Sequence, residues 1–364
     1  MIKKECIIVG GGPAGLCAAS MALSAGCEVL LIERSAKLGG QLIKQTHKFF
    51  GSKNQYAKWR GFDIAEKLIS EIIDHPKLTV LYNTTVVGLY KDQVITVLCG
   101  QEYTRYQGGA LLVATGASEK FLAFENNDLP GVYGAGAIQT LMNIYGVLPG
   151  KNVVMVGSGN IGLIVSYQLI QAGAFVSTIV EAAPIIGGYK VHASKLVRLG
   201  TKILTSTTVK RAIGKDHVEA VEIISLDENF KEIEGSSRII ACDALCVSVG
   251  LSPMHHLLSM IGAQTKYIPE LGGFVPLIDS RFQTSLPAIF AVGDCVGIEE
   301  ASAAMMEGFL GGLYISEYLN KKHPDHNQLI DKYEKELFLL RDGPFGKKTK
   351  VGLKKMEDAK QHVE

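Results

Sequence analysis

Residues 5–40 read ECIIVGGGPAGLCAASMALSAGCEVLLIERSAKLGG, and this stretch decides the fold. It begins with the apolar residues of a buried strand, turns through glycines, continues as a helix of small residues, and returns to a strand that ends at Glu33. Gly10 permits the tight turn, Gly12 lets a pyrophosphate approach the backbone at the helix N-terminus, and Gly15 lets the helix pack closely on the strand. The stretch therefore predicts a βαβ unit that binds a dinucleotide, with Glu33 accepting hydrogen bonds from a ribose.

The same pattern recurs in residues 151–184, which read KNVVMVGSGNIGLIVSYQLIQAGAFVSTIVEAAP. Gly157, Gly159 and Gly162 follow a strand and open a helix, and the next strand ends at Glu181. Each unit ends in glutamate rather than in a neutral residue followed by arginines, which favours a ribose with a free 2'-hydroxyl over a 2'-phosphate. The second unit therefore predicts NAD rather than NADP.

Three further apolar stretches end in residues that suit a cofactor site. They are ALLVATGASEK (110–120), CDALCVSVGLSP (242–253) and TSLPAIFAVGDCVG (284–297). The last of them delivers Gly293 and Asp294 to a predicted helix over residues 299–319.

These five motifs, in this order, resemble the pyridine nucleotide-disulfide oxidoreductase superfamily with the compact layout of thioredoxin reductases, over about residues 4–320. The resemblance implies an α/β fold of two Rossmann-like dinucleotide-binding domains, with the NAD domain inserted in a discontinuous FAD domain. We expect the FAD domain at residues 1–125 and 255–325, the NAD domain at 126–254, and a helical, basic tail at 326–364. That tail is either one solvated helix with a frayed end or a docking segment for a partner.

The resemblance also implies the site residues, with FAD on the first unit and NAD on the second. Asp294 would hold the ribityl chain, and Glu300 with Ala301 would lie where a helix N-terminus faces the flavin pyrimidine. The expected cofactor contacts are Gly10, Gly12, Pro13, Ala14, Gly15, Glu33, Arg34, Gly40, Gln41, Val86, Ala114, Thr115, Gly116, Gly157, Ser158, Gly159, Asn160, Ile161, Glu181, Gly250, Gly293, Asp294, Glu300 and Ala301.

The redox dithiols of these relatives are missing. The cysteines of the glutathione-reductase branch would fall on Leu42 and His47, and those of the thioredoxin-reductase branch on Thr140 and Asn143. Electrons that reach the flavin must therefore leave by a route other than an internal disulfide.

The seven cysteines offer no substitute dithiol. Cys242 and Cys246 are expected on one strand, where four residues separate them by about 13 Å, beyond the reach of a disulfide. Cys6, Cys17, Cys27 and Cys295 are expected to be small buried side chains, although Cys295 could also be reactive if it lies near the flavin. An odd number of scattered cysteines fits reduced thiols.

Residues 129–162 further resemble the α subunits of proline dehydrogenase, opine oxidase, hydrogen cyanide synthase and multimeric sarcosine oxidase. That resemblance implies an oligomeric amino-acid or amine dehydrogenase complex, in which a second flavoprotein subunit oxidises a small-molecule substrate and this chain exchanges electrons with NAD. No cysteine follows Cys295, so an iron–sulfur relay would need a separate protein. The alternatives are a stand-alone NADH-dependent reductase of a small redox protein or small molecule, and a non-catalytic structural subunit that binds flavin and NAD.

Lys44 and His47 are the candidate catalytic residues. A lysine beside flavin N1 or N5 stabilises negative charge on the reduced ring, and an imidazole exchanges protons near neutral pH. The alternative is an exposed pair on a surface loop. His255 and His256 are adjacent and lack further ligands, so we expect no metal site.

The bulk composition limits the classes of partner. A formal net charge of +1 argues against a nucleic-acid or anionic-membrane surface. No uninterrupted apolar segment reaches the roughly 20 residues of a membrane span, so a cytoplasmic location is expected. Tyr56, Trp59 and Arg60 are expected to line the FAD site or a groove for a partner.

Overall fold

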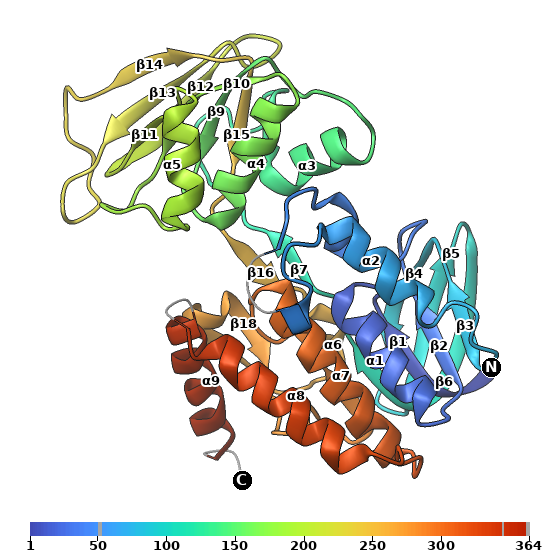
Figure 1. Ribbon diagram of the computed structural model, residues 1–364. Helices are drawn as coiled ribbons and strands as arrows, with labels where there is room; N and C mark the ends of the chain where they lie inside the picture. The colour runs from blue at the N-terminus through green and yellow to red at the C-terminus, as the bar shows by residue number, and fades with distance from the viewer. Residues whose placement is uncertain (50–52, 344–345, 362–364) are drawn as a thin grey trace. The chain divides into compact units, whose positions relative to one another are not determined.

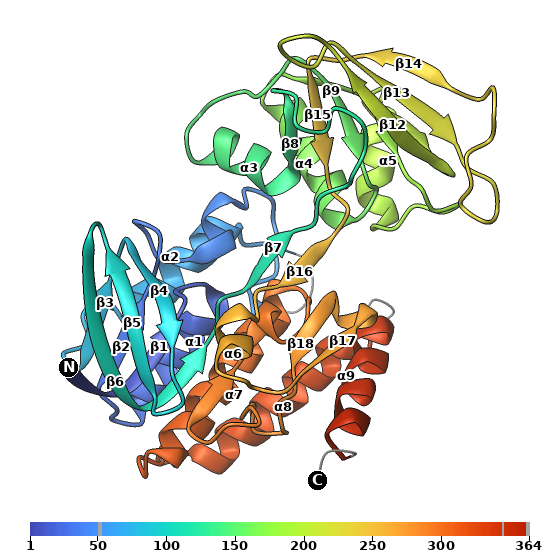
Figure 2. The same cartoon turned by 180° about the vertical axis from the view of Figure 1, so that it is seen from behind.

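The computed structural model describes residues 1–49, 53–343 and 346–361, and its contacts divide the chain into two compact units. Figures 1 and 2 show the two units from opposite sides. The first unit comprises Met1–Ile43, Lys48–Ser118 and Leu251–Glu364, and the second comprises Lys44–His47 and Glu119–Gly250.

A seven-stranded sheet forms the centre of the first unit. Its parallel part contains β3 (Leu78–Leu81), β2 (Val29–Ile32), β1 (Ile2–Val9), β6 (Glu102–Val113) and β19 (Ile289–Ala291). The first half of the long strand β6 pairs antiparallel with β5 (Val94–Cys99), which pairs antiparallel with β4 (Thr84–Leu89). The parallel strands are thus joined to an antiparallel meander.

The parallel strands are buried on both faces because apolar side chains occupy both alternating sets of positions. In β1, Cys6 and Ile8 belong to a core with the helices α1 (Pro13–Ser24), α2 (Gly61–Ser70) and α7 (Ala301–Tyr318). Ile7 and Val9 belong to a second core with β4, β5 and the short helix α6 (His256–Met260).

Helices α1 and α7 approach closely because glycines of α7 face the α1 backbone. A Cβ at Gly308 would lie 2.2 Å from the carbonyl oxygen of Ala14, and one at Gly312 would lie 2.4 Å from that of Ala18. Any larger residue there would separate the helices. The start of α7 is therefore fixed against the helix that follows the first glycine motif.

Two helices follow α7, which corrects the expectation of one solvated helix and a basic tail. Helix α8 (His326–Arg341) packs along α7, with the rings of Tyr333 and Phe309 stacked at 4.6 Å. Helix α9 (Gly346–Gln361) packs on the hairpin of β17 (Thr265–Ile268) and β18 (Gly273–Pro276), with Met356 in a small core. The sequence contained a signal for the packed face of α8 that the prediction did not use, because apolar residues recur there at helical spacing. The residues of α8 that pack on the core are Leu329, Ile330, Tyr333, Leu337 and Leu340.

The second unit is a five-stranded parallel sheet covered by helices on one face and a smaller sheet on the other. Helices α3 (Ala135–Asn143), α4 (Asn160–Gln171) and α5 (Lys190–Arg198) share one core with the strands. The antiparallel sheet of β12 (Thr207–Ile213), β13 (Ala220–Ser225) and β14 (Arg238–Ala241) packs on the opposite face. The parallel strands, in order, are β11 (Lys202–Leu204), β10 (Phe175–Val180), β9 (Asn152–Val156), β15 (Ala244–Val247) and β8 (Val132–Gly134).

The chain runs from the first unit to the second through β7 (Ala117–Glu119) and returns through β16 (Leu251–Pro253), and these strands pair. Short 3-10 helices complete the elements: η1 (Gly40–Lys44), η2 (Lys53–Gln55), η3 (Pro269–Leu271) and η4 (Gly293–Cys295). Within the described residues, no helix combines the length and apolar character that a membrane crossing requires. The predicted fold class, two Rossmann-like units with the second inserted in the first, is confirmed.

Candidate functional site

The first glycine motif can hold only glycine at two of its positions. Gly10 has φ +108°, and a Cβ there would lie 2.3 Å from the carbonyl oxygen of Ala114, just after the end of the neighbouring strand. A Cβ at Gly15 would lie 1.8 Å from the carbonyl oxygen of Gly10. These contacts bring the N-terminus of α1 against the ends of β1 and β6, as predicted for Gly10 and Gly15.

The space beside Gly12 suits a pyrophosphate. A Cβ at Gly12 would have only the Cα of Gly40 within 4 Å, at 3.9 Å, and no side chain caps the N-terminus of α1. The first amides of a helix lack intrahelical acceptors and carry the positive end of the helix dipole. Pro13 opens the helix, so the amides of Ala14 and Gly15 point to this space and can receive an anion.

Glu33 follows β2, and each oxygen of its carboxylate accepts a hydrogen bond from a backbone amide. Its Oε2 accepts from the amide of Gly11 at 2.8 Å, and its Oε1 accepts from the amide of Ser35 at 2.8 Å. The carboxylate is 7 % exposed and lies against the glycine turn. Each carboxylate oxygen has a second lone pair available, so Glu33 can accept from ribose hydroxyls without losing its own contacts.

The second glycine motif repeats this geometry. Gly157 has φ +99°, and a Cβ there would lie 2.1 Å from the carbonyl oxygen of Ser248. A Cβ at Gly162 would lie 2.3 Å from the carbonyl oxygen of Gly157, while one at Gly159 would meet nothing within 4 Å. The N-terminus of α4, at Asn160, therefore also begins beside open space, as the sequence predicts for a second dinucleotide.

Glu181, at the end of β10, makes the contacts that Glu33 makes and one more. Its Oε2 accepts from the amide of Ser158 at 2.8 Å and from the hydroxyl of Ser158 at 2.6 Å. Its Oε1 accepts from the amide of Ala183 at 2.9 Å. The carboxylate is thus held in one position at the edge of the second glycine turn.

In each unit, the glycine turn, the N-terminus of the following helix and the glutamate that follows the next strand surround one space, which we call a cradle. A glycine pair completes each cradle, and the sequence predicted a role for only one of these four glycines, Gly40. The amide of Gly39 donates to the carbonyl of Gly11 at 2.8 Å, and the amide of Gly188 donates to the carbonyl of Ser158 at 2.8 Å. Each pair begins six residues after its glutamate, at Gly39 and at Gly187. Aligning the two halves of the sequence on Glu33 and Glu181 would have found them.

The Gly293–Asp294 turn, in η4, lies at the start of the segment that leads into α7. Gly293 has φ +75°, and its amide donates to Oε2 of Glu307 at 2.7 Å. Asp294 Oδ1 accepts from the amide of Glu299 at a long 3.4 Å. Burial raises the pKa of Asp294 to about 7, against the lowering effect of that amide. A half-buried carboxylate with one long hydrogen bond fits a site that receives ligand hydroxyls.

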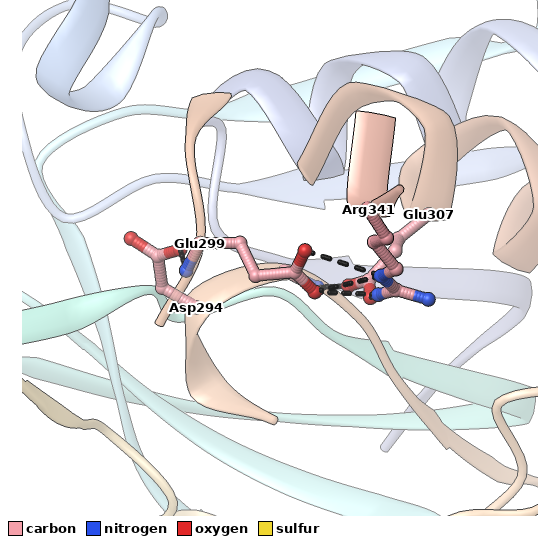
Figure 3. A network of polar contacts seen from close by, with 5 residues as sticks. Asp294, Glu299, Glu307 and Arg341 are labelled. Atoms are coloured by element: carbon pink, nitrogen blue, oxygen red, sulfur yellow. Dashed lines mark hydrogen bonds and ion pairs between the residues drawn. The ribbon is translucent and has the colours of Figure 1, made fainter. Parts of the chain in front are cut away.

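An arginine from α8 joins two glutamates near this turn (Figure 3). The Nη2 atom of Arg341 lies 2.5 Å from Oε1 of Glu299 and 2.5 Å from Oε1 of Glu307. Burial raises the pKa of Glu307, and the charge of Arg341 opposes that rise. Sequence reasoning missed this network, because nothing near Arg341 in the sequence marks it as a partner of α7.

Lys44 belongs to the second unit, where its side chain is already engaged. Its Nζ donates to the carbonyl of Gly136 at 3.0 Å and lies 3.5 Å from the hydroxyl of Thr140. The side-chain amide of Asn143 donates to the carbonyl of Lys44 at 2.7 Å. Burial lowers the pKa of Lys44, against the effect of Glu119. Thr140 and Asn143, which occupy the positions of the thioredoxin-reductase cysteines, thus both contact Lys44.

His47 lies close to a second histidine, His192 on α5. Burial, and then the charge of His192, lower the pKa of His47 to about 4, so that the imidazole is neutral at neutral pH. In the same segment, Thr46 Oγ1 accepts from the side-chain amide of Gln168 at 2.8 Å. Lys44 and His47 are half-buried, which excludes the exposed-pair interpretation within this unit. Their role beside the flavin stays a prediction.

The cysteines expected in the core are buried. Cys242 lies before β15, so the expectation that it shares one strand with Cys246 is wrong. The two cysteines pack in different cores, on opposite faces of the second unit's sheet, so they do not pair. The thiol of Cys295 donates to the carbonyls of Val113 at 3.3 Å and Val292 at 3.2 Å. Burial raises the pKa of Cys295 to about 12, so the thiol stays protonated and the idea that it is reactive gains no support.

The structure gives the following local environments for the remaining predicted contacts. Thr115 donates its hydroxyl to the carbonyl of Met254 at 2.7 Å. Val86 is buried within β4. Glu300 is the N-cap residue of α7, beside Ala301. Positive φ angles occur at Gly40, Gly116 and Gly250. The exposed residues of the set are Arg34, Gln41, Ile161, Gly250 and Glu300.

Two groups singled out in the sequence lie on the surface. Tyr56 and Trp59, with ring centres 5.6 Å apart, lie next to Arg60 and a hollow of the first unit that Trp59 and Arg60 line. His255 and His256 stack on each other at 4.8 Å. Among the described residues, no group of three or more histidine, cysteine or acidic side chains could hold a metal ion.

Known proteins resemble this chain over most of its length. Residues 4–308 match the family model described as pyridine nucleotide-disulphide oxidoreductase. The alpha subunit of sarcosine oxidase from Rhizobium meliloti (strain 1021) is 29% identical over 289 residues, which are 74% of this chain and 27% of that protein. An opine oxidase subunit from Agrobacterium tumefaciens (strain Ach5) is 24% identical over 332 residues, 85% of this chain and 64% of that protein. The chain thus spans less than two thirds of the length of either relative.

A relative of similar length also matches. Ferredoxin--NADP reductase of Ignicoccus hospitalis is 25% identical over 328 residues, 87% of this chain and 98% of that protein. The crystal structure of thioredoxin reductase from T. acidophilum has a TM-score of 0.71 at 19% identity, over 87% of this chain and 99% of that chain. At that identity the likeness concerns the fold, and it confirms the predicted thioredoxin-reductase-like layout.

Proposed function

Since the chain belongs to the pyridine nucleotide-disulphide oxidoreductase family, we propose that it transfers hydride between NAD(H) and FAD and exchanges electrons with a partner outside the chain. Family membership makes it an oxidoreductase that binds FAD and a nicotinamide dinucleotide. The proposal adds the choice of NAD, the absence of an internal disulfide step, and the setting in an amino-acid or amine dehydrogenase complex.

The observation that carries the proposal is the fixed carboxylate of Glu181. Three donors hold it where a ribose would lie, and it would repel a 2'-phosphate. The sequence between Glu181 and Lys190 contains no lysine or arginine that could pair with such a phosphate. These two features support NADH over NADPH.

The residues of the first unit fit FAD in the order that the resemblance implies. We assign the adenosine ribose to Glu33 and the pyrophosphate to the N-terminus of α1. We assign the ribityl hydroxyls to Asp294, and the flavin pyrimidine to the N-terminus of α7 at Ala301, where the helix dipole favours negative charge. When bound, the flavin supplies hydride acceptance, and the protein contributes mainly position and electrostatics.

The missing dithiol supports an external electron partner. Thr140 and Asn143 occupy the positions of one dithiol, and the seven cysteines contain no replacement pair. The relatives named as subunits of sarcosine oxidase and opine oxidase favour a complex in which a second flavoprotein subunit oxidises the amine or amino acid. A separate iron–sulfur protein would then relay electrons, and a cytoplasmic location remains expected.

A second candidate function is a stand-alone reductase of a small redox protein. The observation that favours it is the ferredoxin--NADP reductase relative, 98% of whose length this chain matches. Glu181 argues against NADP as the dinucleotide of such a reductase, because its carboxylate would repel the 2'-phosphate. The two candidates differ in whether the purified chain alone reduces an acceptor.

The test is an anaerobic titration of the FAD-loaded protein with NADH and, separately, NADPH, following the loss of flavin absorbance. We expect bleaching with NADH at far lower concentration than with NADPH. Equal bleaching by both would contradict the role of Glu181. No bleaching by either would leave a non-catalytic subunit, or one that needs its partner, as the interpretation. Subsequent oxidation by an added small redox protein, without any other subunit, would favour the stand-alone reductase.

A further inference from the structure

The pair Glu299 and Glu307 depends on Arg341 for its counter-charge (Figure 3). The side chains of Arg341, Glu299 and Glu307 are 15%, 11% and 5% exposed. Besides the contacts from Nη2, the Nε atom of Arg341 donates to both oxygens of Glu299 at 3.1 Å. In the part of the chain that the structure describes, no other cation pairs with either carboxylate. One buried guanidinium thus serves two carboxylates.

Both carboxylates belong to the segment assigned to the flavin. Glu307 accepts from the amide of Gly293 at 2.7 Å, and the amide of Glu299 donates to Asp294 at 3.4 Å. Glu299 also lies two residues before Ala301, the first residue of α7. Arg341 therefore connects the turn at one end of the segment with the helix start at the other.

Arg341 comes from outside the part of the chain that the family model matches, which ends at residue 308. It is the last residue of α8, and α8 is anchored on α7 separately from it. Phe309 stacks on Tyr333, and Tyr314 donates its hydroxyl to Glu334 at 3.0 Å. The packing of α8 on α7 thus holds Arg341 in place. Its charge lies beside Glu299 and Glu307, which are within the residues that the family model matches.

We propose that Arg341 is a positioning residue for the flavin. It holds Glu299 and Glu307, and through them the Gly293–Asp294 turn and the start of α7, in the arrangement that accepts the cofactor. Its charge also offsets two carboxylates that would otherwise disfavour electron uptake by the flavin. The inference rests on the assignment of this turn to the flavin in the proposed function.

The test compares wild type with Arg341→Met in the FAD-loaded protein. Two quantities are measured: the Kd for FAD, and the midpoint potential of the bound flavin by equilibration with redox dyes. Neither uses NADH, so the result is independent of the proposed reaction. Removing the cation leaves uncompensated buried carboxylates. We expect FAD binding to weaken about tenfold. The preference for reduced over oxidised flavin should also fall about tenfold, a shift of about −30 mV for a two-electron couple.

Three further variants separate charge from packing. Lys335→Met removes an exposed cation from the same helix and should leave both quantities unchanged. Arg341→Lys should recover most of the potential but less of the FAD affinity, because an ammonium cannot bridge both carboxylates with the same fork of donors. Glu299→Gln with Glu307→Gln keeps Arg341 and the hydrogen bond to Gly293, and should shift the potential in the positive direction.

The double glutamine variant also keeps the proposal testable if Arg341→Met does not fold. A positive shift in that variant supports the electrostatic role. An unchanged potential in both Arg341→Met and the double variant would overturn it, and loss of FAD with an unchanged potential would reduce Arg341 to a purely structural role. If the assignment of the turn to the flavin is wrong, no variant moves the potential, although Glu33→Ala would still weaken FAD binding.

Discussion

The two βαβ units share their local geometry and differ in what closes over them. Gly10 and Gly157 each face a carbonyl just after the end of a neighbouring strand, which leaves no room for a Cβ. Glu33 and Glu181 accept from backbone amides at corresponding positions of the two units. The first unit then receives β19, the Gly293–Asp294 turn and α7 from far along the chain. In the second unit the corresponding places are taken by β8 and the shorter helix α3, which precede its glycine motif and have no acidic turn between them.

This difference suits the two cofactors. The Asp294 turn and the longer helix α7 give the first site groups that the second site lacks, which fits the proposal that a flavin stays bound there. The second site, without such a turn, fits the proposed exchange of a nicotinamide dinucleotide at every turnover. The proposed difference between the two sites therefore depends on residues outside the glycine motifs.

The largest expected effect is that of Gly157→Ala, which should disable the second cradle and leave the first intact. A Cβ at Gly157 would lie 2.1 Å from the carbonyl oxygen of Ser248, so the turn must move and the second cradle is lost. We expect NADH-dependent flavin reduction to fall more than about 100-fold, because such backbone clashes belong to the most damaging substitutions. FAD content should stay normal, because the units have separate cores. The measurements are stopped-flow flavin reduction and bound FAD per protein.

The matched control for this substitution is Gly173→Ala. Gly173 has φ +97°, close to that of Gly157, but a Cβ there would meet nothing within 4 Å. It carries the cost of the backbone angle without the clash, and reduction by NADH should remain near wild type. Loss of FAD from Gly157→Ala would show that the two units do not behave separately.

The next effect is expected from Glu181→Ala. The variant removes the acceptor of the ribose hydroxyls, and leaving such groups unpaired costs roughly 2–3 kcal/mol. We expect kcat/KM for NADH to fall about 30-fold to 100-fold while that for NADPH changes little, so that the preference narrows. Glu228→Ala, at an exposed position of the same unit, is the control. An equal fall for both nucleotides would point to a structural role instead.

The next prediction concerns Asp294 and the pH dependence of the stability of the FAD-free protein. Asp294 has a pKa of about 7 in the folded, FAD-free protein, above its ordinary 3.8, because burial disfavours its charge. Folding therefore binds a proton between these values, and the contribution of Asp294 to stability falls as pH rises from about 4 to about 7. Asp294→Asn should remove this loss.

The expected result is that FAD-free Asp294→Asn matches wild type near pH 4 and is more stable at pH 8, by up to about 4 kcal/mol for a pKa difference of about three units. Urea unfolding at both pH values measures it. Asp331→Asn, at an exposed position of α8, should show no such difference. An identical pH dependence in wild type and Asp294→Asn would mean that Asp294 is charged in the folded protein throughout.

The smallest effect concerns Ser158, at one of the positions where the two glycine motifs differ. The hydroxyl of Ser158 donates to Glu181 at 2.6 Å and accepts from the amide of Gly187 at 3.0 Å, whereas the first unit has Gly11 there. Ser158→Ala removes both contacts, and a loss of about 1 kcal/mol predicts a KM for NADH about fivefold higher with kcat unchanged. A lower kcat with normal KM would contradict this positioning role.

Local patterns were sufficient to predict both cradles. The glycine spacing, the flanking apolar strands and the terminal glutamates lie within about 35 residues of one another, and a βαβ unit is specified by contacts of that range. The missing dithiol was equally visible, because an absent residue type needs no structure. The family comparison confirms the superfamily that these patterns indicated.

By itself, therefore, the sequence determined two glycine motifs of the dinucleotide-binding type, their order, and the absence of the dithiols of the two reductase branches. Only the tertiary structure decided that Arg341 serves Glu299 and Glu307, and that Lys44 and His47 belong to the second unit. The physical reason is range. Arg341 lies 42 residues from Glu299 and Lys44 lies 92 residues from Gly136, and contacts across such distances have no periodic or local signature.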